Sequence, residues 1–138
     1  MTLLKLTSPG VPDVYQGDEL ELLQLVDPDN RGPVDWERRR ALLDEVLAGA
    51  PLREETAQLH VLTRVLRLRA ALPEAFAGPY EPLAADEGVC AFERSAVRVA
   101  VPIRPDAAKG EAPDGWRDLL PELHVGLFVR SDAYPTGA

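Results

Sequence analysis

Residues 5–20 read Lys-Leu-Thr-Ser-Pro-Gly-Val-Pro-Asp-Val-Tyr-Gln-Gly-Asp-Glu-Leu and continue an apolar run that begins at Leu3. The Ser8–Gly10 triplet is a turn signal, because proline fixes φ and glycine permits a positive φ. Pro12 then disfavours helix at the residue before it, so the chain is expected to continue in an extended conformation. We therefore predict a strand buried on both faces over Leu3–Val14, with a polar loop after it.

Two clusters of hydrogen-bonding side chains follow the predicted strand. The first is Gln16–Glu19 and the second is Asp27–Arg31. Together they hold more carboxylates, amides and guanidinium groups than turn closure requires, which indicates a polyhydroxylated ligand. The second cluster begins like a calcium loop, but its fifth position is Arg31 and its twelfth is Arg38 instead of a bidentate glutamate. We therefore predict no metal site.

Two helices are expected next. Asp35 is a suitable N-cap for the first, which ends at Gly49, and the second is predicted over Glu54–Leu72 with Pro73 after it. Arg38–Arg40 fan round the first helix, which favours a solvated face with intrahelical ion pairs. The apolar stripe expected on this helix comprises Trp36, Leu42, Leu43, Val46 and Leu47.

The last third of the chain has the pattern of antiparallel strands. Alternation predicts a hairpin from Val89–Arg94 and Val97–Val101, and a final strand over His124–Arg130. His60, on the apolar face of the second helix, is interpreted as structural, since no second ligand sits at helical spacing. Cys90 is interpreted as a small buried apolar residue.

Composition narrows the class of protein. The chain has 138 residues, 46% of them hydrophobic and 28% charged, with a formal net charge of −8. This acidic balance argues against a nucleic-acid or anionic-membrane partner. A lone cysteine and the absence of a signal-peptide pattern favour a cytoplasmic location.

The segment Pro9–Glu19 resembles the region around the eighth strand of the α-amylase superfamily barrel, glycoside hydrolase family 13. Leu25–Arg31 with Pro33–Asp35 is similar to the maltooligosyltrehalose synthase branch of that superfamily. The downstream residues Arg67, Leu68, Arg69, Leu72, Pro73, Phe76 and Gly78 follow the same pattern. The resemblance runs from about Leu3 to Val101 and returns near Leu119–Val129.

The resemblance implies an α+β fold from the C-terminal portion of a larger protein. Residues 1–50 would be the last strand and helix of a (β/α)8 barrel, residues 51–77 a connecting helix, and residues 78–138 a small antiparallel β-domain. One strand and one helix cannot form a covered parallel sheet by themselves, so the first seven barrel strands are expected upstream.

The resemblance also implies a chemistry. The family is an isomerase of trehalose biosynthesis: it converts the end of a maltooligosaccharide to a trehalose unit by intramolecular transglucosylation, a retaining reaction without a cofactor. Its catalytic carboxylates follow strands four, five and seven, so no residue here inherits a catalytic role and the chain alone is expected to be inactive. The predicted substrate-binding residues are Tyr15, Gln16, Asp18, Glu19, Asp29, Asn30 and Arg31.

Several alternatives remain open at this point. Asp18 and Glu19 would serve equally well as loop buttresses, and Arg31 as a partner of Asp27 or Asp29. The chain as a whole would also fit another α-amylase superfamily member, a non-catalytic α-glucan-binding or assembly module, or a remnant without binding. Expected partners are a maltooligosaccharide and either the missing barrel portion or a second copy of the chain.

Overall fold

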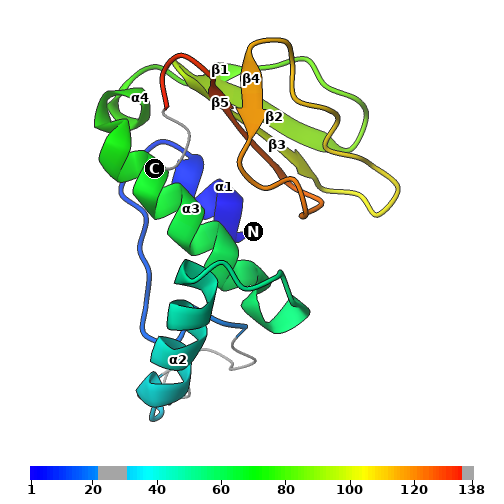
Figure 1. Cartoon of the computed structure of the whole chain (residues 1–138). Coiled ribbons are helices and arrows are strands. Elements are labelled where there is room, and N and C mark those ends of the chain that lie inside the picture. The colour runs from blue at the N-terminus through cyan, green and yellow to red at the C-terminus, as the bar shows by residue number, and fades with distance from the viewer. Residues whose placement is uncertain (22–30, 135–138) are drawn as a thin grey trace.

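A computed structural model describes residues 1–21 and 31–134. In these residues one antiparallel sheet of five strands forms a layer, and helices cover one of its faces (Figure 1). The strands, in the spatial order β1-β2-β3-β5-β4, are β1 (Glu81–Pro82), β2 (Val89–Arg94), β3 (Val97–Pro102), β5 (Gly126–Arg130) and β4 (Trp116–Asp118). The predicted antiparallel sheet is therefore present.

The centre of the sheet is the predicted hairpin. Strands β2 and β3 pair with Phe92 opposite Val99, and Ser95 takes a positive φ of 55° in the tight connection between them. Strand β5 then pairs with the other edge of β3, with Leu127 opposite Val99. Alternate residues of these strands face the helices, as the period of two in the sequence predicts.

The main hydrophobic core lies between this sheet face and α3 (Ala57–Ala71). Val65 and Leu68 of α3 are completely buried, as are Val99 and Leu127 of the sheet. The predicted second helix is confirmed, with a 3-10 turn over Glu54–Thr56 before it. Beyond it the chain forms a short helix that was not predicted, α4 (Pro73–Ala77), for which proline is favourable in the first turn.

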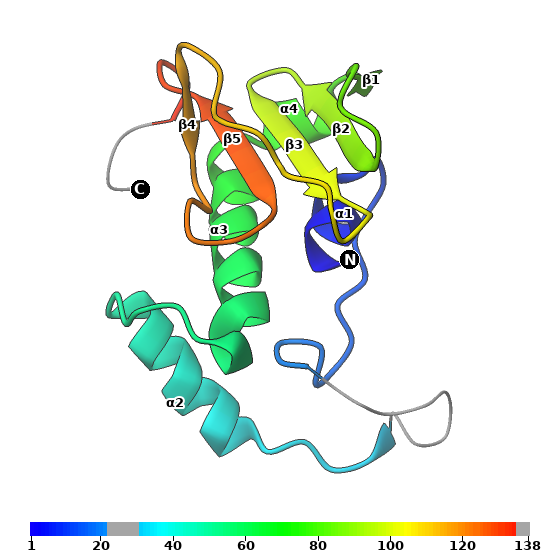
Figure 2. The same ribbon diagram turned by 90° about the vertical axis from the view of Figure 1, so that its right-hand side faces the viewer.

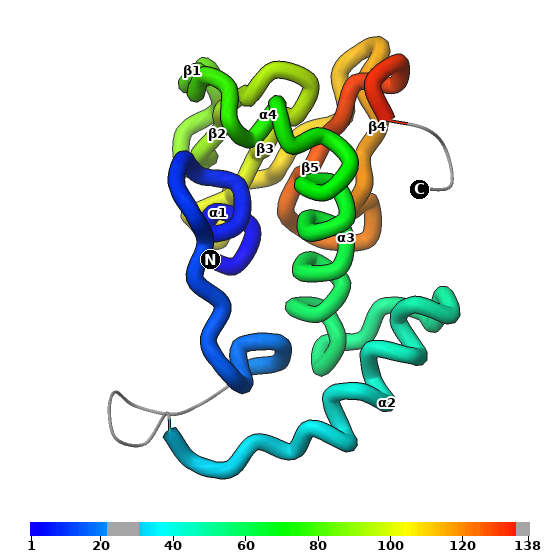
Figure 3. The backbone as a smooth tube through the Cα atoms, turned by 90° about the vertical axis from the view of Figure 1, so that its left-hand side faces the viewer, coloured from blue at the N-terminus to red at the C-terminus, as the bar shows by residue number. Residues whose placement is uncertain are grey.

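The strand predicted over Leu3–Val14 is wrong, because Thr2–Thr7 form a helix, α1. A strand needs a neighbour for its backbone groups, and in the described part of the chain none flanks this segment. A helical turn satisfies these groups internally, and Leu3 and Leu6 then share one face, buried against the core. Residues 11–15 join no strand and run away from the sheet (Figure 3).

Helix α2 (Trp36–Leu47) begins as predicted, because the Asp35 carboxylate accepts a hydrogen bond from the Arg38 amide at 2.9 Å. It lies at the end of the molecule remote from the sheet (Figure 2). The expected apolar stripe is only partly buried: Leu42 is covered, whereas Trp36 is 50% and Leu47 is 47% exposed. A second, smaller cluster joins Leu20, Leu42 and Leu59.

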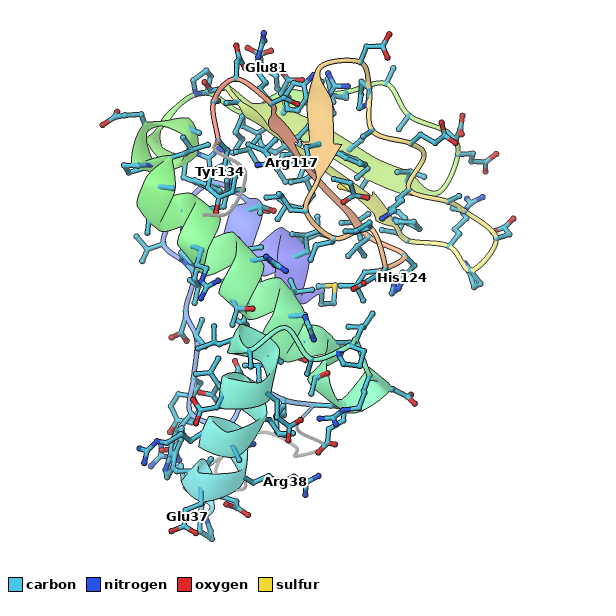
Figure 4. The ribbon with its side chains drawn as sticks, viewed as in Figure 1. Glu37, Arg38, Glu81, Arg117, His124 and Tyr134 are labelled. Atoms are coloured by element: carbon cyan, nitrogen blue, oxygen red, sulfur yellow. The ribbon has the colours of Figure 1, made fainter. Side chains whose placement is uncertain are left out.

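Near the C-terminal end of the described chain, Tyr134 folds back onto the sheet (Figure 4). Its carbonyl accepts a hydrogen bond from the Arg117 guanidinium at 2.9 Å, and its ring lies 5.6 Å from that group. Tyr134 is 5% exposed and belongs to the main core.

Two leucines of α3 test this packing. Leu68 is fully buried and Leu66, half a turn away, is 47% exposed. We expect Leu68→Ala to lower the free energy of unfolding by about 2–5 kcal/mol, because it leaves a cavity. Leu66→Ala should change it by about 0.5 kcal/mol or less. Urea denaturation measures both, and equal losses would contradict the assigned core face.

Candidate functional site

The predicted sugar-facing residues Tyr15, Gln16, Asp18 and Glu19 lie in one tight turn between α1 and α2. The Asp18 amide donates to the Tyr15 carbonyl at 3.1 Å, and the Asp18 carboxylate accepts from the Tyr15 amide at 3.3 Å. Gly17 is buried and has a φ of 95°, which a glycine adopts without strain. The sequence therefore folds locally into a turn closed by one of its own acidic side chains.

Asp18 connects this turn to two helices. Its Oδ2 atom accepts a hydrogen bond from Nζ of Lys5 in α1 at 3.0 Å. Its backbone carbonyl accepts one from Nε2 of Gln58 in α3. These contacts join segments far apart in the sequence and hold the turn in one position relative to the helices.

Glu19 and Arg39 complete the support from α2. Nε of Arg39 donates to Oε2 of Glu19 at 3.2 Å, and its Nη2 atom donates to the Gly17 carbonyl at 3.2 Å. Glu19 also accepts from the Gly17 amide at 3.1 Å. The Arg39 side chain is only 13% exposed, so these charge-assisted hydrogen bonds are partly shielded from water.

The acidic pair of this turn therefore has a buttressing role in the structure. The bonds of Asp18 and Glu19 use Oδ2 and Oε2, and Oδ1 and Oε1 carry no hydrogen bond to the described residues. Tyr15 is 43% exposed, Gln16 is partly buried, and Arg31 is exposed. Asp29 and Asn30 lie outside the described residues.

A hollow of about 630 Å³ opens beside this turn. Most of its lining is charged, and it comprises Leu20, Glu21, Asp35, Arg38, Arg39, Arg53, Glu54 and Glu55. Arg38 donates to Glu55, and this hydrogen bond lowers the pKa of the Glu55 carboxyl and raises the pKa of Arg38. Arg53 pairs with Glu45 at 2.5 Å.

These pairs correct the prediction for Arg38–Arg40. We expected intrahelical ion pairs, but Arg38 and Arg39 reach acids outside α2, at Glu55 and Glu19. Partners 17 and 20 positions away leave no local signal in the sequence. Sequence reasoning therefore missed Arg39 as a support of the turn.

His60 lies away from this site, in a hollow of about 110 Å³ beside Arg64 and Glu122. Its Nε2 atom is buried without a hydrogen-bond partner among the described residues. Burial, together with the positive charges of Arg64 and Arg53, outweighs the opposing charge of Glu122 and lowers the pKa of the imidazole.

Residues 1–21 and 31–134 contain no group of three or more His, Cys, Asp or Glu side chains placed to hold a metal ion. They also contain no helix that is long and apolar enough to cross a membrane.

The sequence of this chain is similar to part of the sequence of putative maltooligosyl trehalose synthases. It is 48% identical, over 162 residues, to putative maltooligosyl trehalose synthases of Mycobacterium tuberculosis strains CDC 1551 / Oshkosh and H37Rv; each alignment covers 95% of this chain. The chain spans about a fifth of the length of these curated relatives, since the match covers 20% of each. No protein-family model matches the chain.

Solved structures of maltooligosyl trehalose synthases also resemble the fold of this chain. The maltooligosyltrehalose synthase of Arthrobacter ramosus superimposes with a TM-score of 0.79 at 32% identity, over 94% of this chain and 21% of that one. A crystal structure of a maltooligosyl trehalose synthase gives 0.76 at 26% identity, over 94% and 21%. The helices and the antiparallel sheet described above therefore match a part of these enzymes.

Arg39 and Arg40 are neighbours in α2 that test the support of the turn. We expect Arg39→Met to lower the free energy of unfolding by about 1–2 kcal/mol, because Glu19 and the Gly17 carbonyl lose a charged donor. Arg40 is exposed, and Arg40→Met should cost about 0.5 kcal/mol or less. Amide hydrogen exchange at Asp18 and Leu20 should speed up only in the Arg39 variant. Equal exchange in both variants would contradict the assignment.

His60 should make the stability depend on pH. Since its pKa is lower in the folded chain, the unfolded chain binds the proton first as the pH falls. The contribution of the neutral His60 imidazole to the free energy of unfolding is fully present above about pH 6.5 and is lost progressively below it. Urea denaturation between about pH 7.5 and 5.5 should give a smaller loss for His60→Gln than for the native chain.

The control is His124→Gln, at an exposed position in the loop before β5 (Figure 4). This variant should follow the curve of the native chain. If His60→Gln also follows that curve, the burial of an uncharged imidazole at His60 is wrong.

Proposed function

The chain is related to the C-terminal portion of maltooligosyl trehalose synthases, and from this premise we propose that it forms one wall of a maltooligosaccharide-binding pocket. The reaction is that of a (1→4)-α-D-glucan 1-α-D-glucosylmutase, an intramolecular transglucosylation that produces a terminal trehalose unit. The observation that carries the proposal is the 48% identity over 95% of the chain. The activity belongs to the assembled enzyme and not to this chain alone.

The turn Tyr15–Glu19 is the proposed contact with the sugar. The half-exposed ring of Tyr15 offers an apolar face and a hydroxyl, a combination that suits a glucose unit. Oδ1 of Asp18 and Oε1 of Glu19 are acceptors for sugar hydroxyl groups, while the other carboxylate oxygens hold the turn. Because three helices fix these groups, little conformational freedom is lost when a ligand binds.

Gln16 and Arg31 are further members of this wall, and Asp29 and Asn30 are assigned to it from the sequence alone. A side-chain amide and a planar guanidinium both donate to hydroxyl oxygens. No catalytic role is assigned to any of these residues. A retaining transglucosylase needs two carboxyl groups about 5–5.5 Å apart on either side of the scissile bond, and we assign these to the remainder of the enzyme.

We further propose that residues 1–50 complete a barrel when that remainder is present, with residues 51–77 as the connection and residues 78–138 as the β-domain. Three exposed apolar side chains support this division: Val11 is 96%, Val14 38% and Trp36 50% exposed. Residues 11–15 also lie outside the sheet, so their backbone is available to a neighbouring strand. The partner is thus a polypeptide that supplies the upstream part of the relatives.

Two exposed tyrosines provide the test. The chain is combined with a polypeptide carrying the upstream part of a relative, and maltopentaose is converted to a non-reducing, trehalose-capped product. Tyr15→Ala should raise KM about three- to tenfold through the loss of an aromatic contact. Tyr80 is 40% exposed but lies beside the sheet, so Tyr80→Ala should leave KM unchanged.

The chain by itself should give no product from maltopentaose. Turnover without the upstream polypeptide would contradict the proposed division of the enzyme. Binding of maltopentaose by the chain alone, with no activity after complementation, would instead identify a non-catalytic α-glucan-binding module.

A further inference from the structure

Arg94, the last residue of β2, is buried in the core at 3% exposure. Among the described residues, its guanidinium donates only to backbone carbonyls. Nη1 lies 3.2 Å from the Thr7 carbonyl and 3.4 Å from that of Ser8. Nη2 donates to the Gly78 carbonyl at 3.1 Å and to that of Phe76. One side chain of the sheet therefore joins the end of α1 to the end of α4.

Arg69 of α3 acts beside it. Its Nη1 atom donates to the Leu6 carbonyl at 2.8 Å. Both guanidinium groups face the Phe76 ring, Arg69 at 4.6 Å and Arg94 at 5.9 Å from the centroid. The last carbonyls of a helix have no partner within it, and cations are favourable at that end. The two arginines, which we call the α1 clamp, thus cap the C-terminus of α1.

Burial of the Arg94 guanidinium in the core costs free energy, because the cation loses its contact with water. Burial, with the neighbouring charge of Arg69, lowers the pKa of Arg94, which shows that its environment disfavours the cation. In the described part of the chain, none of the hydrogen-bond partners of Arg94 is a carboxylate. An apolar side chain at this position would leave the carbonyls of Thr7, Ser8, Phe76 and Gly78 without these donors. The arginine is therefore explained by the backbone segments that it joins.

The clamp does fix the point from which the proposed sugar-binding turn departs. Helix α1 has six residues, too few for a stable isolated helix, so its position depends on its contacts. The chain leaves it at Ser8 in an extended conformation, and Lys5 of the same helix holds Asp18 at 3.0 Å. The position of the turn Tyr15–Glu19 is thus tied to α1 in two ways: by the backbone segment that joins them and by the ion pair between Lys5 and Asp18.

We propose that Arg94 is a positioning residue through which the β-sheet sets the location of the turn Tyr15–Glu19, and with it the affinity for maltooligosaccharide. Arg94 does not touch the sugar and takes no part in bond breaking. The β-domain then has a defined task in the enzyme: it anchors one wall of the pocket. This inference rests on the proposed function for its consequence, but the anchoring itself is a property of this chain.

Amide hydrogen exchange in the purified chain tests the anchoring without any sugar. We expect Arg94→Met to speed up exchange at Ser8, Asp18 and Leu20 about tenfold or more relative to Val99 and Leu127 in the sheet. Arg94→Lys, which keeps the charge and some of the hydrogen bonds, should recover part of the protection. Arg98→Met is the control on the next strand, where the side chain pairs with Glu93 instead of α1.

A general loss of stability is separated from anchoring by Val99→Ala, a core variant at a residue whose apolar side chain donates no hydrogen bond to the α1 carbonyls. If Arg94→Met speeds up exchange in the turn no more than Val99→Ala does, once both are corrected for their global free energy of unfolding, the inference is overturned. If Arg94→Met is too unstable to purify, the comparison is made with Arg94→Lys under the same criterion.

The consequence for the sugar is read in the complemented enzyme. Arg94→Met should raise KM for maltopentaose about tenfold and leave kcat within about twofold, as expected when ground-state and transition-state binding are lost equally. A fall in kcat at constant KM would overturn the positioning role. If the native complemented enzyme is inactive, the proposed function fails, while the exchange experiment still decides whether the α1 clamp anchors the turn.

Discussion

The packing of α1 against α3 and the inner face of the sheet is the contact on which the rest of the structure depends. Leu6 is completely buried and Leu3 nearly so, in one core with Val65 of α3 and Val99 of β3. A helix of this length has little stability of its own, so these apolar contacts and the guanidinium caps together keep it formed. The position of the turn Tyr15–Glu19 follows from them.

This dependence explains how a sheet far from the candidate site contributes to it. The turn is held by Lys5 of α1, Gln58 of α3 and Arg39 of α2. Helices α1 and α3 both pack on the sheet. The apolar contacts of α2 lie instead in the second, smaller cluster, where Leu42 packs with Leu20 and Leu59. The turn Tyr15–Glu19 is therefore supported by packed helices on the side that faces the core and is less covered on the side of α2, where Trp36 is exposed.

Local signals predicted much of the fold from the sequence. The Asp35 cap, the proline at position 73 and the alternation in Val89–Arg94 and Val97–Val101 each act within a few residues, and each correctly located an element. The prediction at Leu3–Val14 failed because an apolar run is compatible with a strand or a short helix, and the choice depends on neighbours. Trp36 is exposed for the same reason, because an apolar stripe shows only that one face of a helix is apolar. Burial of that face also depends on a neighbouring segment, and this part of the chain does not cover Trp36.

The candidate site was predicted only in its chemistry. The sequence indicated that Asp18 and Glu19 belong to a polar loop, but their partners Lys5 and Arg39 are 13 and 20 positions away and could not be inferred. The role of Arg94 could not be inferred from the sequence either, because its contacts with Thr7 and Ser8 span 87 and 86 positions. Contacts of this range are determined by tertiary packing and leave no periodic signal in a single sequence.

The most direct measurement is a crystal structure of the chain assembled with the upstream polypeptide and soaked with a maltooligosaccharide. The account predicts a glucose unit against the ring of Tyr15, with its hydroxyl groups within hydrogen-bonding distance of Oδ1 of Asp18 or Oε1 of Glu19. A sugar bound in the assembled pocket with the turn Tyr15–Glu19 out of reach would contradict it.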